Sequence, residues 1–479
     1  MRIVFKLVLS LLLATQTFAQ SSGTDLVLVG GTIVDGSGKP RFRGNVRIRA
    51  GEIVDVGTFQ PARGETILNV AGLIVAPGFI DIHNHSADAL GEKPDALSQV
   101  SQGITTVVLG PDGGGPIGIE KFMLPFDEKP LALNAMAFVG HANVRVRVMG
   151  ANYKRAATPE EITRMEELVE DAMREGAFGI SSALEYDPGS YSTIDEVVAL
   201  AKIAGRYGGI YMTHLRDEGD KVLDAIAEAI DIGRRANIPV QISHLKLGSA
   251  GVWGKSAEVL ALIDKARAQG VNVAADVYPY NTVRSAVRSA IRLEDVGGPA
   301  NVLIIASPMH PEYKLKTLDQ IAKDRAIAPL VLYNELLKEG ETTVATTSIA
   351  EKDLTALLRH PWVMISSDGG LEIADPRSTG AFARVLGKIV REDKTLTLEV
   401  AVRKMSGLPA SRLGLKERGL LAKGAAADIV VFDPNLVRDS STIQEPGALS
   451  QGIKHVFVNG TAVIKDGQPT EARPGIALR

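Results

Sequence analysis

The chain has 479 residues, a formal net charge of −3 and no cysteine. This length permits a large core, and the mildly acidic balance argues against nucleic acid as a partner, because phosphate backbones attract basic proteins. The absence of cysteine excludes disulfides, thiol nucleophiles and thiolate metal ligands.

Residues 1–19 resemble a secretory signal peptide. Arg2 and Lys6 precede a short run of leucine and valine, and Ala19 offers a small residue for cleavage. This order is typical of a signal peptide, and the apolar run is short for the alternative, an uncleaved membrane anchor. No later segment is long and apolar enough to span a bilayer. We therefore expect an exported enzyme, periplasmic or secreted, with no stable membrane anchor after cleavage.

Both ends of the remaining chain predict short β-strands. Valine- and isoleucine-rich runs separated by glycine and aspartate occupy residues 25–75, and the same texture returns between residues 427 and 464. Such spacing is typical of a small antiparallel sheet or sandwich. We predict one small β-sandwich domain formed from residues 20–76 and 415–479.

The middle of the chain alternates between strand-like runs and amphipathic helices. The predicted helices are residues 159–175, 194–207, 221–237 and 256–269. Alternation of this kind predicts a parallel sheet, and its continuation to a run at 363–366 favours a (β/α)8 barrel over residues 77–414. A doubly wound open sheet is the alternative, although no glycine-rich phosphate loop follows an early strand. Residues 284–355 interrupt the alternation of strands and helices. They are predicted to be an insertion, plausible as a lid over the site.

His83 and His85 are the first candidate metal ligands. They follow the apolar run at residues 73–80. In a strand, residues i and i+2 point to the same face, so the two imidazoles lie side by side. Neutral imidazole is a good zinc ligand, although two histidines in a packed core would explain the spacing equally well.

His214, His244 and Asp368 repeat this placement. Each comes directly after an apolar run, at the end of a predicted barrel strand. The C-terminal strand ends of such a barrel meet on its catalytic face. Any one of these side chains could be a buried structural group, but their shared position predicts a metal site.

The other histidines give weaker signals. His310, His360 and His455 lie in loop-like or C-terminal settings and are predicted to be ordinary surface residues. His141 also follows a strand-like run, and it could either support the site or pack in the core.

Several motifs resemble a known family. Residues 77–85, with sequence PGFIDIHNH, resemble the first-strand motif of the amidohydrolase superfamily. The segments that resemble the D-aminoacylase (N-acyl-D-amino-acid deacylase) family are residues 211–219, 241–246, 276–280, 367–369, 427–433 and 458–460. The similarity runs from about residue 25 to 470, and it implies a zinc-bearing (β/α)8 barrel with a small β-sandwich built from both termini.

The resemblance also implies a ligand set. His83 and His85 would bind one metal and His214 and His244 the other, with Asp368 as an acid/base that also contacts the metal. Many family members carry a cysteine after the second strand, where this chain has Asp112. Either Asp112 binds metal or Glu185, which follows the fourth predicted strand, bridges two ions. We favour Glu185, and therefore expect two zinc ions per chain, with manganese, cobalt and iron as alternatives.

Substrates of the family carry a free α-carboxylate. Lys246 and Tyr278 match the family's carboxylate-binding pattern, although Lys246 could instead be a solvated loop residue. Arg377 is a further candidate in a motif where Asp375 replaces the family's histidine.

The implied reaction is hydrolysis of N-acyl-D-amino acids by a metal-activated hydroxide, giving a carboxylate and a free D-amino acid. Alternatives on the same scaffold are a D-residue dipeptidase, an isopeptidase or a cyclic-amide hydrolase. A non-catalytic metal- or ligand-binding protein is the alternative from another class.

Overall fold

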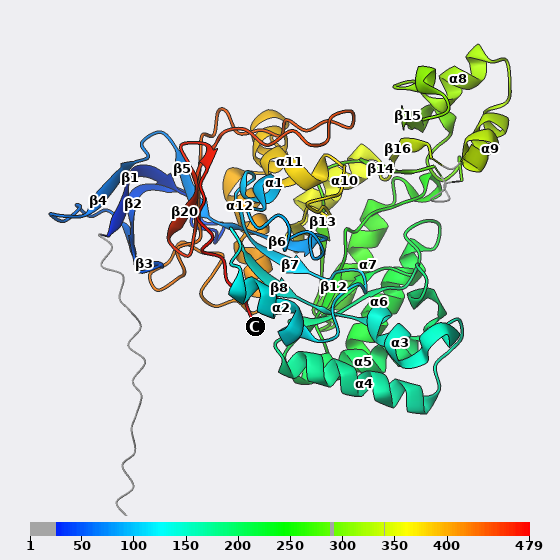
Figure 1. Ribbon diagram of the computed structural model, residues 1–479, viewed down its shortest axis with the longest axis horizontal. Helices are drawn as coiled ribbons and strands as arrows, with labels where there is room; N and C mark the ends of the chain where they lie inside the picture. Colours follow the sequence, from blue (N-terminus) through cyan, green and yellow to red (C-terminus); the bar gives the residue numbers. More distant parts are fainter. Residues whose placement is uncertain (1–24, 288–291, 340) are drawn as a thin grey trace, which may run out of the picture.

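The computed structural model describes residues 25–287, 292–339 and 341–479 (Figure 1). The predicted signal peptide lies outside these residues. Among the described helices, none is both long and apolar enough to cross a membrane. Figure 1 shows a β-domain on one side, a barrel in the centre and an α/β insertion that projects from the barrel.

Both chain ends contribute to one nine-stranded sheet, as predicted. The two ends meet where β5 pairs parallel with β1 and antiparallel with β18. Valine, isoleucine and leucine side chains from both ends, such as Val46 and Ile429, form its core. The strands are β1 (Leu26–Ile33), β2 (Phe42–Arg49), β3 (Glu52–Gly57), β4 (Thr66–Asn69), β5 (Ile74–Pro77), β18 (Ile429–Phe432), β19 (Ile453–Val458), β20 (Thr461–Lys465) and β21 (Gln468–Pro469).

The central domain is the predicted barrel of parallel strands. Its strands are β6 (Phe79–Asn84), β7 (Ile104–Leu109), β8 (Asn134–Ala137) with β9 (Val139–Gly140), β10 (Gly179–Ala183), β11 (Ile210–His214), β12 (Val240–Ile242), β13 (Val273–Val277) and β17 (Val363–Ile365). The first and last strands meet beyond their C-terminal ends, where the amide of His85 donates to the carbonyl of Gly369 at 2.8 Å. Alternate side chains fill the barrel interior, for example Met212, or pack under the helices, for example Tyr211.

The predicted helices form within one residue of their expected bounds. The α4 helix begins at a capping box, in which Thr158 and Glu161 each accept a hydrogen bond from the other's backbone amide. The helices around the barrel are α1 (Leu97–Val100), α2 (Ile119–Glu128), α3 (His141–Met149), α4 (Pro159–Arg174), α5 (Ile194–Arg206), α6 (Val222–Ala236), α7 (Ser256–Ala268), α10 (Glu351–Arg359), α11 (Arg377–Arg384), α12 (Leu398–Met405) and α13 (Gly407–Arg412).

The insertion is a small α/β unit with its own core. A three-stranded antiparallel sheet is covered by two helices, and residues such as Leu332 and Val344 are fully buried between them. Its elements are β14 (Thr282–Ala286), β15 (Val302–Ala306), α8 (Leu318–Asp324), α9 (Pro329–Glu339) and β16 (Thr343–Thr347). The predicted range to residue 355 was too long, because α10 packs against β17 and α7 as a barrel helix.

Candidate active site and metal centre

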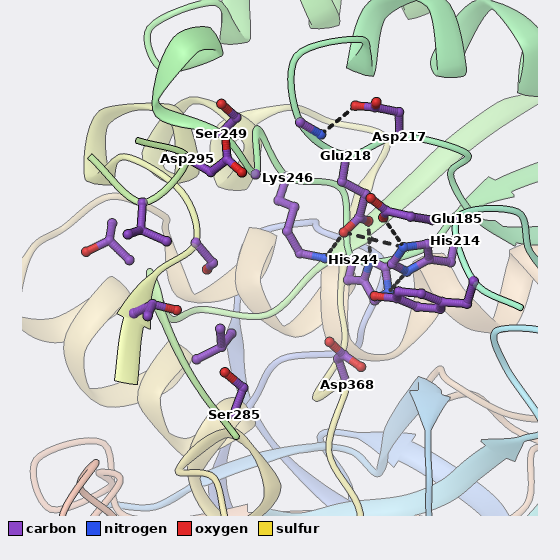
Figure 2. A pocket seen from close by; sticks show the side chains of 18 of the residues that line it. Glu185, His214, Asp217, Glu218, His244, Lys246, Ser249, Ser285, Asp295 and Asp368 are labelled. Carbon is purple, nitrogen blue, oxygen red and sulfur yellow. Dashed lines mark hydrogen bonds and ion pairs between the residues drawn. The ribbon is translucent and has the colours of Figure 1, made fainter. Parts of the chain in front are cut away.

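A cavity of about 670 Å³ opens at the C-terminal ends of the barrel strands. Its floor holds the side chains that follow β10, β11, β12 and β17, and its far wall comes from the insertion (Figure 2). The sequence prediction of a site on this face is therefore matched by the placement of the residues.

His83, His85, Asp112 and Asp368 converge beside the floor, which Asp112 and Asp368 line. The Nε2 atoms of His83 and His85 lie 3.1 Å apart. The Oδ2 atom of Asp112 is 3.1 Å from His83 Nε2 and 3.4 Å from His85 Nε2. Asp368 Oδ1 is 3.2 Å from His85 Nε2. Two imidazoles and two carboxylates directed at one point form a donor set that suits zinc.

His214 and His244 form the second half of the cluster. His214 Nδ1 faces His244 Nε2 at 3.0 Å, and Asp112 Oδ2 lies 3.6 Å from the same His244 nitrogen. Both rings are almost completely buried. Two ring nitrogens this close repel unless a proton or a metal ion lies between them, so these side chains fit a bound cation.

Asp112, and not Glu185, lies between the two histidine pairs. Our preference for Glu185 as the bridge is therefore not supported by the geometry: its Oε2 contacts Nε2 of His214 at 2.8 Å, on the ring edge opposite to His244. Asp112 adopts a left-handed conformation with φ of +53°. It replaces a thiolate with an oxygen ligand at the centre of the cluster.

Opposing charges set the protonation of these groups. Burial would raise the pKa of Asp368, but the charges of Arg377, His244 and His83 outweigh it and hold that pKa well below its usual range. Burial would lower the pKa of His85, but Asp112 and Asp368 raise it to about 9. The carboxylates of Asp112 and Asp368 thus favour a positive charge on His85, at the point where the candidate ligands converge.

The three predicted carboxylate-binding residues surround this floor, but two are already paired. Arg377 Nη1 contacts Asp368 Oδ2 at 2.5 Å, and Lys246 Nζ contacts Glu218 Oε2 at 2.5 Å. Tyr278 lies under the guanidinium of Arg377, with 4.9 Å between Cζ and the ring centroid. Its hydroxyl is buried and has no hydrogen-bond partner among the described residues.

Comparison with known proteins agrees with this geometry. Residues 127–464 match the profile of the amidohydrolase family. The chain is 38% identical to the N-acyl-D-glutamate deacylase of Alcaligenes xylosoxydans xylosoxydans, over 95% of this chain and 96% of that protein. The chain belongs to the amidohydrolase family.

Two solved amidohydrolase structures are similar over nearly the whole chain. A D-aminoacylase described as having a binuclear metal centre shows a TM-score of 0.85 and 33% identity, over 95% of this chain and 100% of that one. The second is the N-acyl-D-glutamate deacylase of Bordetella bronchiseptica in complex with zinc and a phosphonate that mimics the tetrahedral intermediate. It shows a TM-score of 0.84 and 34% identity, over 95% of this chain and 99% of that one.

Sequence reasoning missed three buried carboxylates that support this amidohydrolase site. Asp81 accepts from the amide and hydroxyl of Ser367, at 2.9 and 2.5 Å, and so ties β6 to the loop that carries Asp368. Asp276 accepts from the amide of His244 at 3.0 Å. Glu218 holds Lys246. Asp81, Glu218 and Asp276 all lie inside the family motifs, and this position in the sequence could have identified them.

The remaining histidines lie away from the cluster. His141 is fully buried and pairs with Glu196 at 2.9 Å, so it packs in the structure without reaching the metal ligands. The prediction of a surface position was wrong for His455, whose side chain is 5% exposed, because β19 directs it inward. His360 is also largely covered and pairs with Asp264, whereas His310 is partly exposed on the insertion.

Proposed function

We propose that the protein is a zinc-dependent hydrolase that cleaves the amide bond of N-acyl-D-amino acids. The observation that carries the proposal is the convergence of four histidines, Asp112 and Asp368 at one end of the barrel, where Asp112, Asp368 and two of the histidines line a cavity. Its full-length relatives, which are N-acyl-D-amino-acid deacylases, supply the substrate class.

Two groups of side chains would hold the metal. His83, His85, Asp112 and Asp368 form one set, and His214 and His244 share Asp112 with it. Zinc in such a set supplies a Lewis acid and a water of lowered pKa.

Asp368 would move the proton. Its low pKa keeps it ionised near neutral pH, so it can accept a proton from the attacking water. It can then donate that proton to the leaving nitrogen, which needs one because an amine anion is a poor leaving group. Arg377 contacts the other carboxylate oxygen and thereby fixes the orientation of Asp368.

Tyr278, Lys246 and Arg377 would receive the α-carboxylate of the substrate. The unpartnered hydroxyl of Tyr278 can donate to a carboxylate oxygen, and the cationic groups of Lys246 and Arg377 lie 6.0 and 4.9 Å from the centroid of its ring. Since Lys246 and Arg377 are each paired with a protein carboxylate, they supply positive potential beside Tyr278 and keep their own geometry fixed.

We further propose that residues 1–19 direct export and are removed. Expression of the whole chain in a bacterial host, followed by fractionation and N-terminal sequencing, tests this. The expected product is a periplasmic or secreted chain that begins near residue 20, and a cytoplasmic chain with an intact N-terminus contradicts export.

The deacylase proposal is tested by a substrate panel. The chain from residue 20, loaded with zinc, should release free amine from N-acetyl-D-amino acids and not from their L-enantiomers. D-dipeptides and hydantoins belong in the same panel, with metal counted per chain. Activity confined to L-substrates or to rings overturns the substrate class, and a chain that binds no zinc overturns the metal site.

A further inference from the structure

Two consecutive residues, Glu185 and Tyr186, contact the ring of His214. Both follow β10, whereas His214 is the last residue of β11. Glu185 Oε2 lies 2.8 Å from His214 Nε2. The Tyr186 ring packs over the imidazole, with 4.4 Å between centroids at an interplanar angle of 40°. Figure 2 shows the Glu185 carboxylate above the outer edge of the His214 ring.

The contact with Glu185 assigns the proton on His214. An ionised carboxylate can only accept a hydrogen bond, so the ring nitrogen that faces it, Nε2, must carry the hydrogen. A neutral ring then has its lone pair on Nδ1. This nitrogen faces His244 Nε2 at 3.0 Å, and Asp112 lies on the same side.

Glu185 cannot at the same time join the two halves of the metal cluster. Its carboxylate is on the edge of His214 that is directed away from His244, and its side chain is 38% exposed on the cavity wall. The corresponding place between the histidine pairs is filled by Asp112, whose Oδ2 lies within 3.6 Å of His83, His85 and His244.

We propose that Glu185 and Tyr186 are positioning residues for the metal centre. Glu185 fixes the tautomer in which His214 binds metal through Nδ1, and Tyr186 holds the plane of the ring. Carboxylates that accept from the outer nitrogen of a metal-binding histidine also increase its basicity, and losing one typically weakens metal binding about 10- to 100-fold. The inference rests on the proposed metal site but not on the substrate.

Zinc affinity, measured by competition with a chromophoric chelator, tests the role of Glu185. Glu185→Ala should weaken binding of the zinc at His214 about 10- to 100-fold. Glu185→Gln keeps a carbonyl oxygen that accepts the same hydrogen bond, so most of the affinity should remain, together with the wild-type number of zinc ions at saturation. A bridging Glu185 predicts instead that Glu185→Gln loses a zinc ion even at saturation.

The cobalt-substituted protein gives a readout that does not depend on activity. Its visible absorption reports the ligand geometry, which Glu185→Ala should change and Glu185→Gln should preserve. For the ring contact, Tyr186→Phe should match the wild type, whereas Tyr186→Ala should weaken zinc binding. Glu167→Ala, at an exposed position on α4, is the control for handling and metal loading.

The outcomes separate the inference from the proposed function. If Glu185→Ala binds zinc as tightly as wild type, or if Glu185→Gln is as defective as Glu185→Ala, the positioning role is wrong while the metal site stands. If wild-type protein binds no zinc, the metal site itself is wrong. Should Glu185→Ala fail to fold, the Gln variant alone distinguishes a positioning acceptor from a bridging ligand by its zinc content.

Discussion

Asp368 is placed between the metal ligands and a cation. One oxygen faces His83 and His85, and the other is held by Arg377. This arrangement leaves the carboxylate ionised and oriented, which a residue that accepts and returns a proton needs.

Replacing Asp368 with Asn should remove the proton carrier while keeping the shape of the site. We expect turnover to fall about 10²- to 10⁴-fold, the usual contribution of a positioned acid/base. Zinc content should stay close to wild type because the histidines and Asp112 remain. Steady-state kinetics and elemental analysis measure the two quantities, and unchanged deacylation would exclude this mechanism.

Replacing Tyr278 with Phe should remove one hydrogen bond to the substrate. A hydrogen bond to a charged group contributes about 1.5–3 kcal/mol, so kcat/KM should fall about 13- to 160-fold, mainly through KM. Tyr280→Phe is the control, because the Tyr280 hydroxyl is already paired with Asp439. A Tyr278→Phe variant with wild-type KM would place the carboxylate elsewhere.

The loop after β7 carries Asp112 into the cluster. Ser181 of β10 closes this loop from the neighbouring strand: its hydroxyl donates to the carbonyl of Gly110 at 2.6 Å and accepts from the amide of Gly113 at 3.1 Å. Gly115 lies so close to Phe138 that a β-carbon would be 2.1 Å from its carbonyl oxygen. The loop is thus held in one conformation by its neighbours.

We expect Ser181→Ala to loosen the loop and weaken zinc binding through Asp112. The loss of two hydrogen bonds by buried backbone groups should also lower the free energy of unfolding by about 1–3 kcal/mol. Chelator competition and chemical denaturation measure these effects. Ser182→Ala is the matched control, because Ser182 bonds to Tyr211 and Thr213 and not to the loop. Equal zinc affinities in the two variants would refute the loop's role.

A buried lysine connects the α12 helix to the barrel. Lys404 is 1% exposed, and its Nζ donates to the carbonyls of His360 and Val363, at the start of β17. Burial lowers its pKa to about 7, and the charge of Arg403 contributes. A neutral amine still has two hydrogens for these two carbonyls.

The lowered pKa of Lys404 predicts how stability changes with pH. Between pH 7 and the ordinary value of 10.5, the unfolded chain binds this proton more than the folded chain does. Stability from this group therefore rises with pH across that window. The denaturation midpoint of wild type should therefore rise relative to that of Lys404→Met from pH 7 to pH 10. A constant difference between the two midpoints would show that Lys404 stays charged when folded.

Local patterns along the chain are enough to predict the architecture and most of the candidate ligands. Helical periodicity and caps are local, so α4 to α7 were predicted within one residue, and ligand-type residues at successive strand ends identified one face of the barrel. That His83, His85, His214, His244 and Asp368 share one face follows from this regularity, because parallel strands bring their carboxyl ends together. His244 and Asp368 themselves lie just past their strands, with positive φ.

Which carboxylate lies between the two histidine pairs depends instead on contacts between distant parts of the chain. Asp112 and Glu185 both follow strands and are equivalent in the sequence, but the left-handed turn at Asp112 depends on contacts with β10 and the adjacent loop. Glu185 likewise takes its place at Nε2 of His214 through a contact with a different strand. Side chains on irregular loops are placed by distant neighbours, whereas those on strands are placed by the strand itself.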